Sequence, residues 1–179
     1  MEAKMEADLR YPVGKFQRAE KITASDRRAM IDAIAETPAK LKAAVAGLNE
    51  KQLDTPYRPG GWTVRQVVHH LADSHLNSFV RFKLALTEHE PTIKSYDEKL
   101  WAELPDSKTP IELSLPVLEG LHKRWTALLN SLSEADWQRV FVHPERGKMT
   151  LSDNLQLYAW HGRHHVGHIT ALRERNGWK

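Results

Sequence analysis

The sequence predicts an all-α protein, a four-helix bundle formed as a single domain over residues 1–179 with an N-terminal extension, residues 1–22. Four segments repeat apolar residues at the three-and-four spacing of a one-sided helix. Strand signals are weak, and the best of them, residues 140–142, is too short to found a sheet. The chain is 41% hydrophobic over 179 residues, which suits one domain with its own core. Four amphipathic helices commonly pack as a bundle.

The first two helices are expected on either side of a Pro-Gly-Gly breaker. The first covers residues 25–47, and Pro38 falls on its apolar face. Because proline has no amide hydrogen, we expect a kink there or a shorter helix that ends just before it. Thr63 can cap the second helix, with Gln66 three residues later in a capping box. The stretch that follows, residues 88–109, holds aromatic residues and is expected to pack across the bundle.

The third and fourth helices have clear N-terminal signals. The third lies within residues 110–132, but Pro116 argues for a later start at Ser114, so two starts stay open. Thr150 is the expected cap of the fourth helix, with Asp153 at its third position. That helix should reach about residue 175 and stop before a glycine.

Composition and charge exclude several classes of function. The 26 basic and 23 acidic residues are interspersed, so the net charge of +3 comes without the basic stripe of a nucleic-acid-binding protein. The sequence contains no apolar run of about 18 residues, so it predicts no membrane-spanning helix. Residues 1–10 lack the apolar core of a secretory signal. The chain has no cysteine, which excludes a disulfide scaffold, a thiolate zinc site and a cysteine nucleophile. The cytoplasm is the expected compartment.

The ten histidines are the unusual feature, because four of them fall within eight residues. Histidine is the commonest metal ligand. On a helix, residues four apart meet on one face, and both His161 with His165 and His164 with His168 have that spacing. At 100° per residue, His161 and His165 project into the buried arc, whereas His164 and His168 fall at its margin. The inward pair therefore predicts two ligands of a metal site.

A third ligand is expected from the second helix, which offers His69, His70 and His75. His69 projects towards solvent, His70 flanks the apolar face, and His75 lies on it, so periodicity alone leaves His70 and His75 open. A hydrogen-bonded core histidine is the expected role for His75. Asp73, one turn after His70, could orient an imidazole or act as a base. Four histidines are expected at the surface: His69, His89, His122 and His143.

Residues 55–75, which contain Val-Val-His-His-Leu, resemble the YfiT-like branch of the DinB superfamily. Residues 157–170, which contain His-Gly-Arg-His-His-Val-Gly-His, resemble the same branch. Shorter matches lie at residues 11–14, 96–99 and 122–129, so the similarity spans nearly the whole chain with no departure at the ligand positions. The resemblance implies a four-helix bundle, often a homodimer, with a zinc or nickel ion on three histidines.

The motifs carry the ligand positions over to this sequence. They imply His70, the second histidine of Val-Val-His-His-Leu, together with His161 and His165. This set agrees with the helical projection and selects His70 over His75. Members of the branch are described as metal-dependent hydrolases, and related members as bacillithiol S-transferases or as mycothiol- or glutathione-dependent enzymes. The resemblance therefore implies a metalloenzyme that acts on a small molecule.

Two reactions use the same ligand set. Three neutral ligands leave a divalent ion its full charge, which can lower the pKa of bound water towards about 7. The ion would act in the same way on the thiol of a low-molecular-weight cosubstrate. Hydrolysis and thiol transfer both stay open, with Asp73 or His164 as the candidate proton acceptor. The alternative class is a non-catalytic, stress-associated metal-binding module, which a fully coordinated ion without a pocket would favour.

Overall fold

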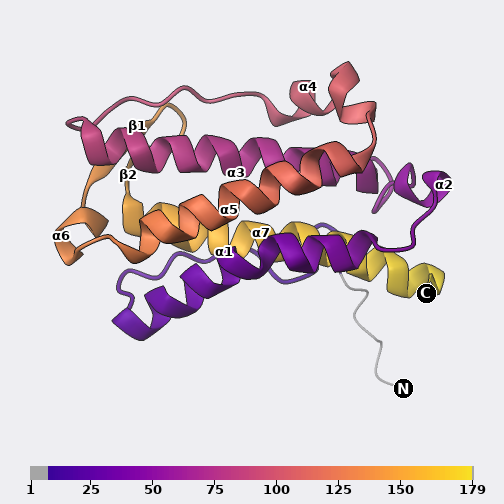
Figure 1. Ribbon diagram of the computed structural model, residues 1–179, viewed down its shortest axis with the longest axis horizontal. Helices are drawn as coiled ribbons and strands as arrows, with labels where there is room; N and C mark the ends of the chain where they lie inside the picture. The colour runs from indigo at the N-terminus through magenta and orange to yellow at the C-terminus, as the bar shows by residue number, and fades with distance from the viewer. Residues whose placement is uncertain (1–7, 179) are drawn as a thin grey trace.

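A computed structural model describes residues 8–178 and confirms the all-α prediction. Four long helices form a bundle (Figure 1): α1 (Ala24–Val45), α3 (Val64–Thr87), α5 (Ser114–Asn130) and α7 (Leu151–Asn176). Within the described residues, no helix combines the length and the apolar character that crossing a membrane requires. The short elements are α2 (Glu50–Leu53), α4 (Glu98–Ala102), η1 (Pro105–Lys108), η2 (Ile111–Leu113), α6 (Glu134–Trp137), β1 (Val140–His143) and β2 (Gly147–Thr150).

The order of the long helices around the bundle differs from their order in the chain. The main contacts of α1 are with α7 and α5, and those of α3 are with α5 and α7, so α1 lies diagonally opposite α3. The helices α1 and α7 run in one direction, and α3 and α5 run in the other (Figure 1). At Gly162, α1 and α7 approach closely, because a Cβ atom there would lie 2.6 Å from Thr37 Oγ1. This order places the two histidine-bearing helices, α3 and α7, side by side.

The helix boundaries follow the capping signals. Thr23, Thr63 and Thr150 each close a capping box at the start of α1, α3 and α7. Of the two outcomes left open at Pro38, the early end is excluded, because α1 continues to Val45. Of the two starts left open for the third helix, the later one is confirmed, because α5 begins at Ser114 and the separate 3₁₀ turn η2 precedes it from Ile111.

Two connecting segments pack along the bundle. The stretch after α3 runs back along that helix, as expected: Ile93 N–H donates to the carbonyl of Val142 in β1, and Gln66 donates to the carbonyl of Ala102 in α4. The N-terminal segment, residues 8–22, lies against α7, where Trp160 Nε1–H donates to the carbonyl of Gly14. The remainder of the expected extension, residues 1–7, lies outside the described residues.

The β-strands form a short hairpin. β1 and β2 pair antiparallel with Val140 opposite Thr150, so the hairpin ends directly at the residue that caps α7. The sequence signal at residues 140–142 therefore marks a real strand. The expectation that this segment is too short to found a sheet was wrong, because it pairs with β2 in a two-stranded sheet that leads directly into α7.

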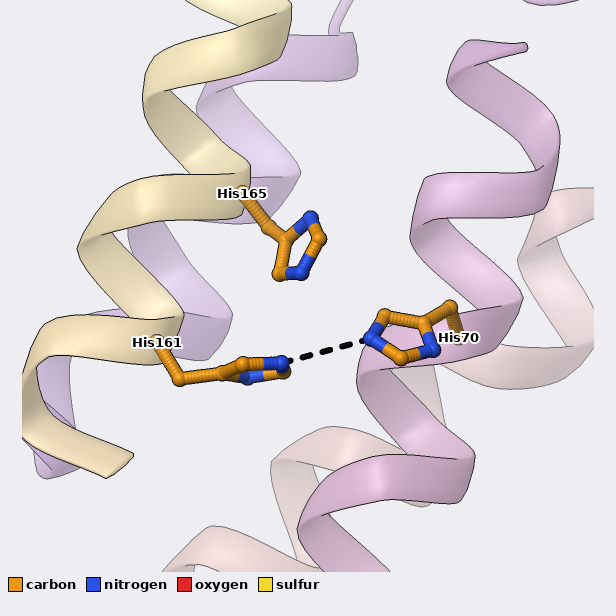
Figure 2. Close-up of side chains that lie close together, drawn as sticks. All are labelled: His70, His161 and His165. Atoms are coloured by element: carbon orange, nitrogen blue, oxygen red, sulfur yellow. Dashed lines mark hydrogen bonds between the residues drawn. The ribbon is translucent and has the colours of Figure 1, made fainter. Parts of the chain in front are cut away.

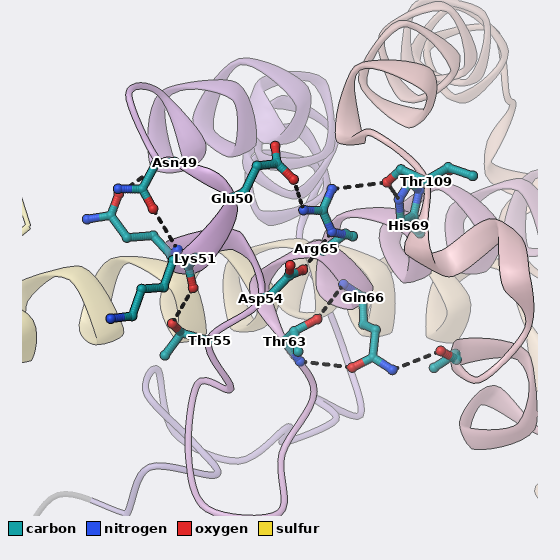
Figure 3. A network of polar contacts seen from close by, with 12 residues as sticks. Asn49, Glu50, Lys51, Asp54, Thr55, Thr63, Arg65, Gln66, His69 and Thr109 are labelled. Atoms are coloured by element: carbon teal, nitrogen blue, oxygen red, sulfur yellow. Dashed lines mark hydrogen bonds and ion pairs between the residues drawn. The ribbon is translucent and has the colours of Figure 1, made fainter.

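The N-terminus of α3 is fastened by a buried arginine (Figure 3). Arg65 donates to the carboxylates of Asp54 at 2.7 Å and Glu50 at 2.6 Å, and to the carbonyl of Thr109 at 3.2 Å. One side chain thereby joins α2, α3 and the segment after η1. The guanidinium fork suits this task because it offers several donors in fixed directions.

A polar layer divides the bundle core into two apolar halves. Each long helix contributes apolar residues to both halves and polar residues between them, so the layer crosses the bundle at mid-height. One half includes Ile34, Phe82, Trp125, Phe141 and Leu155. The other includes Leu41, Val67, Leu71, Leu118 and Ile169. Between them lie His70, Ser74, His75, His122, His161 and His165.

Candidate metal centre

Three of the predicted residues meet in the polar layer. His70 projects from α3, and His161 and His165 project from successive turns of α7 towards it (Figure 2). One ligand nitrogen from each ring lies within 4.8 Å of the others. Among the described residues, this is the one group of three or more histidine or acidic side chains with such spacing. The structure thus brings together the three residues that the sequence singled out as ligands.

The arrangement fits a metal ion held by imidazole nitrogens. Two ligands of one tetrahedral zinc ion, each about 2.0–2.1 Å from it, have nitrogens about 3.3–3.4 Å apart. The Nε2 atoms of His70 and His161 are 3.3 Å apart. A set of imidazoles without a carboxylate is typical of sites for zinc, nickel, copper or iron. The donor chemistry and this distance therefore both agree with a divalent transition metal.

The electrostatics of the site favour the ligating form of each ring. Burial lowers the pKa of His70 to about 3, with a further decrease from the neighbouring His164. Burial also lowers the pKa of His161 and of His165 well below the usual value, and the other histidines of the cluster lower both further. All three rings are therefore neutral at pH 7, and a neutral imidazole keeps the lone pair that a metal requires.

A cavity of about 330 Å³ opens onto the three histidines. Trp62 covers one side, its ring centroid 4.6 Å from that of His70 and 6.1 Å from that of His165. The lining also includes Tyr96, whose phenol pKa is raised above its ordinary value by burial. Glu98, Glu145 and Arg146 lie at the exposed rim. The site therefore has room for a small molecule beside the histidines.

Arg81 also lines this cavity and is only 7% exposed. Within residues 8–178, it makes neither an ion pair nor a hydrogen bond with another residue. It lies eleven residues after His70, which on a helix is about three turns along the same face. A buried cation without a partner is costly, so its position in the cavity wall favours an anionic ligand.

A second cavity, about 760 Å³, lies between α1 and α5. It is larger than the first, but none of the three clustered histidines lines it. Its walls combine apolar residues with Lys42, Glu112, Glu119 and Lys123. Because size alone does not supply chemistry, we take the smaller cavity as the candidate active site.

The two suggested proton acceptors lie beside the cluster and do not line its cavity. Asp73 is half-buried, and burial together with the nearby charge of Asp106 raises its pKa. Its carboxylate makes no hydrogen bond with a histidine in the described part of the chain. The ring of His164 stacks on Trp160 with centroids 4.3 Å apart, and burial lowers its pKa to about 4. Roles for Asp73 and His164 stay predictions.

The remaining histidines divide differently from expectation. His75 is a hydrogen-bonded core residue, as expected, and is fully buried. His69, His122 and His143 were expected at the surface, and this was wrong, because they are only 5%, 1% and 7% exposed. The sequence did hold a signal for His122, which lies four residues after Leu118 and three before Trp125, on the buried stripe of α5.

Comparisons with known proteins agree with the fold and with the metal site. A sequence profile of the DinB superfamily matches residues 33–169. A Bacillus mycoides protein named "Putative metal-dependent hydrolase" is 57% identical over 171 residues, which is 96% of this chain and 99% of that protein. A Bacillus anthracis protein of the same name shows the same identity and coverage.

A solved structure shares the whole architecture. YfiT from Bacillus subtilis, described as "a probable metal-dependent hydrolase with an unusual four-helix bundle topology", superimposes with a TM-score of 0.93 at 52% identity, covering 97% of this chain and 100% of that one. The diagonal placement of α1 and α3 is in keeping with that description. The match over most of the chain, in sequence and in structure, leads to one conclusion: this chain belongs to the DinB superfamily.

Proposed function

We propose that this protein is a metal-dependent hydrolase in which His70, His161 and His165 hold a divalent zinc or nickel ion. The observation that carries the proposal is the meeting of three neutral imidazoles from two helices on the wall of a cavity. The names of the relatives point in the same direction. A divalent ion held by three neutral ligands supplies Lewis acidity, which lowers the pKa of a coordinated water or thiol.

The other side chains of the cavity would bind and orient the substrate. Arg81, buried and without a partner in the described structure, would pair with an anionic group such as a carboxylate or phosphate. Tyr96 would donate a hydrogen bond through its phenol, which is protonated at neutral pH. Trp62 would exclude water from the histidine side of the cavity. The proposed substrate is therefore a small molecule with an anionic group some distance from the reacting bond.

The test removes the metal and then separates the candidate reactions. The protein is stripped with a chelator, reloaded with zinc, nickel or manganese, and assayed on small esters and amides with and without an added thiol. Each substrate is offered as an anionic and a neutral version. We expect hydrolysis only in a metal-loaded form, without any need for thiol, and with preference for the anionic version.

Each other outcome has a definite meaning. Thiol-dependent adduct formation with an electrophile, without hydrolysis, would replace the hydrolase by a thiol S-transferase. Stoichiometric metal without turnover of any substrate would favour the non-catalytic module. Full turnover by the stripped protein would overturn the role of the histidines altogether.

We also propose that the protein is a homodimer. Apolar side chains are exposed one turn apart on two helices: Leu76 and Val80 on α3 are 45% and 43% exposed, and Leu113 and Val117 around the start of α5 are 61% and 52% exposed. Apolar surface of this kind is typical of subunit contacts. Light scattering at micromolar concentration tests the proposal, and a monomer mass would reject it.

A further inference from the structure

Two more buried histidines continue inward from His161 as a chain of hydrogen bonds. His161 Nδ1 lies 3.0 Å from His75 Nε2, and His75 Nδ1 lies 2.8 Å from His122 Nε2. His122 Nδ1 then lies 2.6 Å from the carbonyl oxygen of Ile34. His75 and His122 are 0% and 1% exposed, and the ring of His122 also lines the second cavity, between α1 and α5. It crosses the bundle from α7 through α3 and α5 to α1.

The far end of the chain is created by Pro38. In a regular α-helix, the carbonyl of Ile34 would accept a hydrogen bond from the amide of residue 38. Proline has no amide hydrogen, so this buried carbonyl lacks its helical partner. His122 supplies the missing donor from another helix. The same bond explains how α1 continues past Pro38 without leaving a buried carbonyl unpaired.

The carbonyl gives the chain a direction. It can only accept, so the proton of His122 is on Nδ1 and its Nε2 accepts from His75. A neutral imidazole has one N–H group, so His75 donates through Nδ1 and accepts through Nε2. His161 must then donate through Nδ1, which leaves its Nε2 without a proton. Burial lowers the pKa of all three rings and so keeps them neutral.

The free nitrogen of His161 is the one that faces the metal position. Its Nε2 lies 3.3 Å from the Nε2 of His70 across the cluster. We infer that His75 and His122, anchored on the Ile34 carbonyl that Pro38 exposes, are positioning residues that fix His161 in the ligating tautomer and orientation. The hydrogen-bonded histidine chain ends on a carbonyl, which cannot donate a proton. Every hydrogen bond in it therefore keeps the same donor and acceptor, and the chain does not carry protons away from the site.

The three candidate ligands differ in this respect. His165 Nδ1 is buried and has no hydrogen-bond partner in the described part of the chain. By contrast, Nδ1 of His161 is hydrogen-bonded to His75, the first of the three hydrogen bonds that lead through His122 to the Ile34 carbonyl. Hydrogen bonds behind a metal ligand typically change metal affinity by about 10- to 100-fold. The chain should therefore strengthen binding through His161 without being essential for it.

The tautomers can be read in the metal-free protein, so the test does not depend on activity. Histidine is labelled with ¹⁵N, and long-range ¹H–¹⁵N correlation spectra report which ring nitrogen carries the proton. We expect the Nδ1–H form for His161, His75 and His122 before zinc is added, and the same form afterwards. An Nε2–H form of His161 in the metal-free protein would overturn the inference.

Variants of His122 separate positioning from packing. His122→Phe keeps a ring but removes both hydrogen bonds, whereas His122→Gln keeps one donor for the Ile34 carbonyl and one acceptor for His75. In a chelator competition assay, we expect His122→Phe to weaken zinc binding about 10- to 100-fold and His122→Gln to restore most of it. His69→Gln, outside the chain, serves as the matched control and should change nothing. Equal zinc affinity in wild type and His122→Phe would contradict the inference.

Two further results keep the test decisive. If His122→Phe does not fold, Pro38→Ala takes its place, because it returns an amide donor to the Ile34 carbonyl and should shift the ¹⁵N resonances of His122 and His75. Unchanged resonances would count against the anchor. The effect on zinc affinity rests on the proposed function, but the tautomer pattern does not. If the protein binds no zinc, the proposed function fails, whereas the tautomers measured in the metal-free protein still show whether the histidine chain has the inferred direction.

Discussion

Two faces of α3 carry buried polar residues with opposite surroundings. On one face, Arg65 donates to two carboxylates and a carbonyl, and both ring nitrogens of His69 have partners, Ser114 Oγ at 2.7 Å and the Thr109 carbonyl at 3.0 Å (Figure 3). On the other face, the ring nitrogens of His70 have no hydrogen-bond partner among the described residues except His161, and Arg81 makes no hydrogen bond or ion pair with another described residue.

Burial does not separate these two faces. Arg65, His69, His70 and Arg81 are 6%, 5%, 8% and 7% exposed. They differ in whether the protein itself satisfies their hydrogen-bonding groups. Buried polar groups normally have hydrogen-bond partners within the protein. Two buried polar residues without such partners, such as His70 and Arg81, therefore indicate a site where a ligand supplies the missing partners. The neighbours His69 and His70 show the contrast within one turn of helix.

The largest expected effect follows directly from this contrast. His70→Ala, His161→Ala or His165→Ala should each abolish stoichiometric metal binding, because two imidazoles do not make a tight site. His69→Ala should keep the metal, since both nitrogens of His69 are bound to the protein. Elemental analysis of the purified variants measures this. Full metal content in His165→Ala would refute the ligand set.

The sequence could predict the histidine face because a helix is a rigid repeat. Period alone put His161 and His165 inward, and capping residues located the starts of α3 and α7. It could not decide between His70 and His75, because both point into the bundle. The choice depends on which helix stands opposite: His70 faces α7, whereas His75 lies between α7 and α5.

The rest of the site depends on contacts between distant parts of the chain. Pro38 was expected to kink or end α1, but the helix continues past it, and the Ile34 carbonyl that Pro38 leaves without a helical partner is bound by His122, 88 residues away. No periodic pattern reports such a contact. Arg81 carried a usable signal, its eleven-residue spacing from His70, but only the structure shows that no carboxylate among the described residues forms an ion pair with it.

The second prediction concerns acid. Burial lowers the pKa of His70 to about 3, and of His122 and His168 to about 4, from 6.5. Between pH 6.5 and about 4, the unfolded chain therefore binds more protons than the metal-free folded protein. The contribution of these neutral buried histidines to the free energy of unfolding is fully present above pH 6.5. It is lost as the pH falls below that value, by about 1.4 kcal/mol per pH unit for each such histidine.

Urea unfolding of the metal-free protein at several pH values checks this prediction. The free energy of unfolding should fall by several kcal/mol from pH 7 to pH 5, given about 1.4 kcal/mol per proton and pH unit. His122→Gln removes one titrating group and should reduce the slope. A free energy of unfolding that stays level over this range would mean that the rings take up protons in the folded state.

The third prediction tests the satisfied face. Arg65→Met removes donors to Glu50, Asp54 and the Thr109 carbonyl, and should lower the free energy of unfolding by about 1–2 kcal/mol. The loss is moderate because the carboxylates of Glu50 and Asp54 are 84% and 59% exposed and can return to water. Metal content should not change. Chemical denaturation and elemental analysis measure the two properties, and loss of metal would show that the two faces are coupled.

The smallest and most telling change in stability is expected at Arg81. Arg81→Met removes a buried charge that has no partner in the described structure, and replacing such a charge by an apolar side chain is often neutral or stabilising. We expect the free energy of unfolding to stay level or to rise by up to about 1 kcal/mol, in contrast to Arg65→Met. Binding of anionic substrates or inhibitors should weaken about tenfold or more, because a charge-assisted hydrogen bond is lost, whereas neutral analogues should bind as before. Thermal unfolding and inhibition constants of the zinc-loaded proteins measure both. A loss of stability as large as that of Arg65→Met would mean that Arg81 has a structural role, and the two faces of α3 would no longer differ as described.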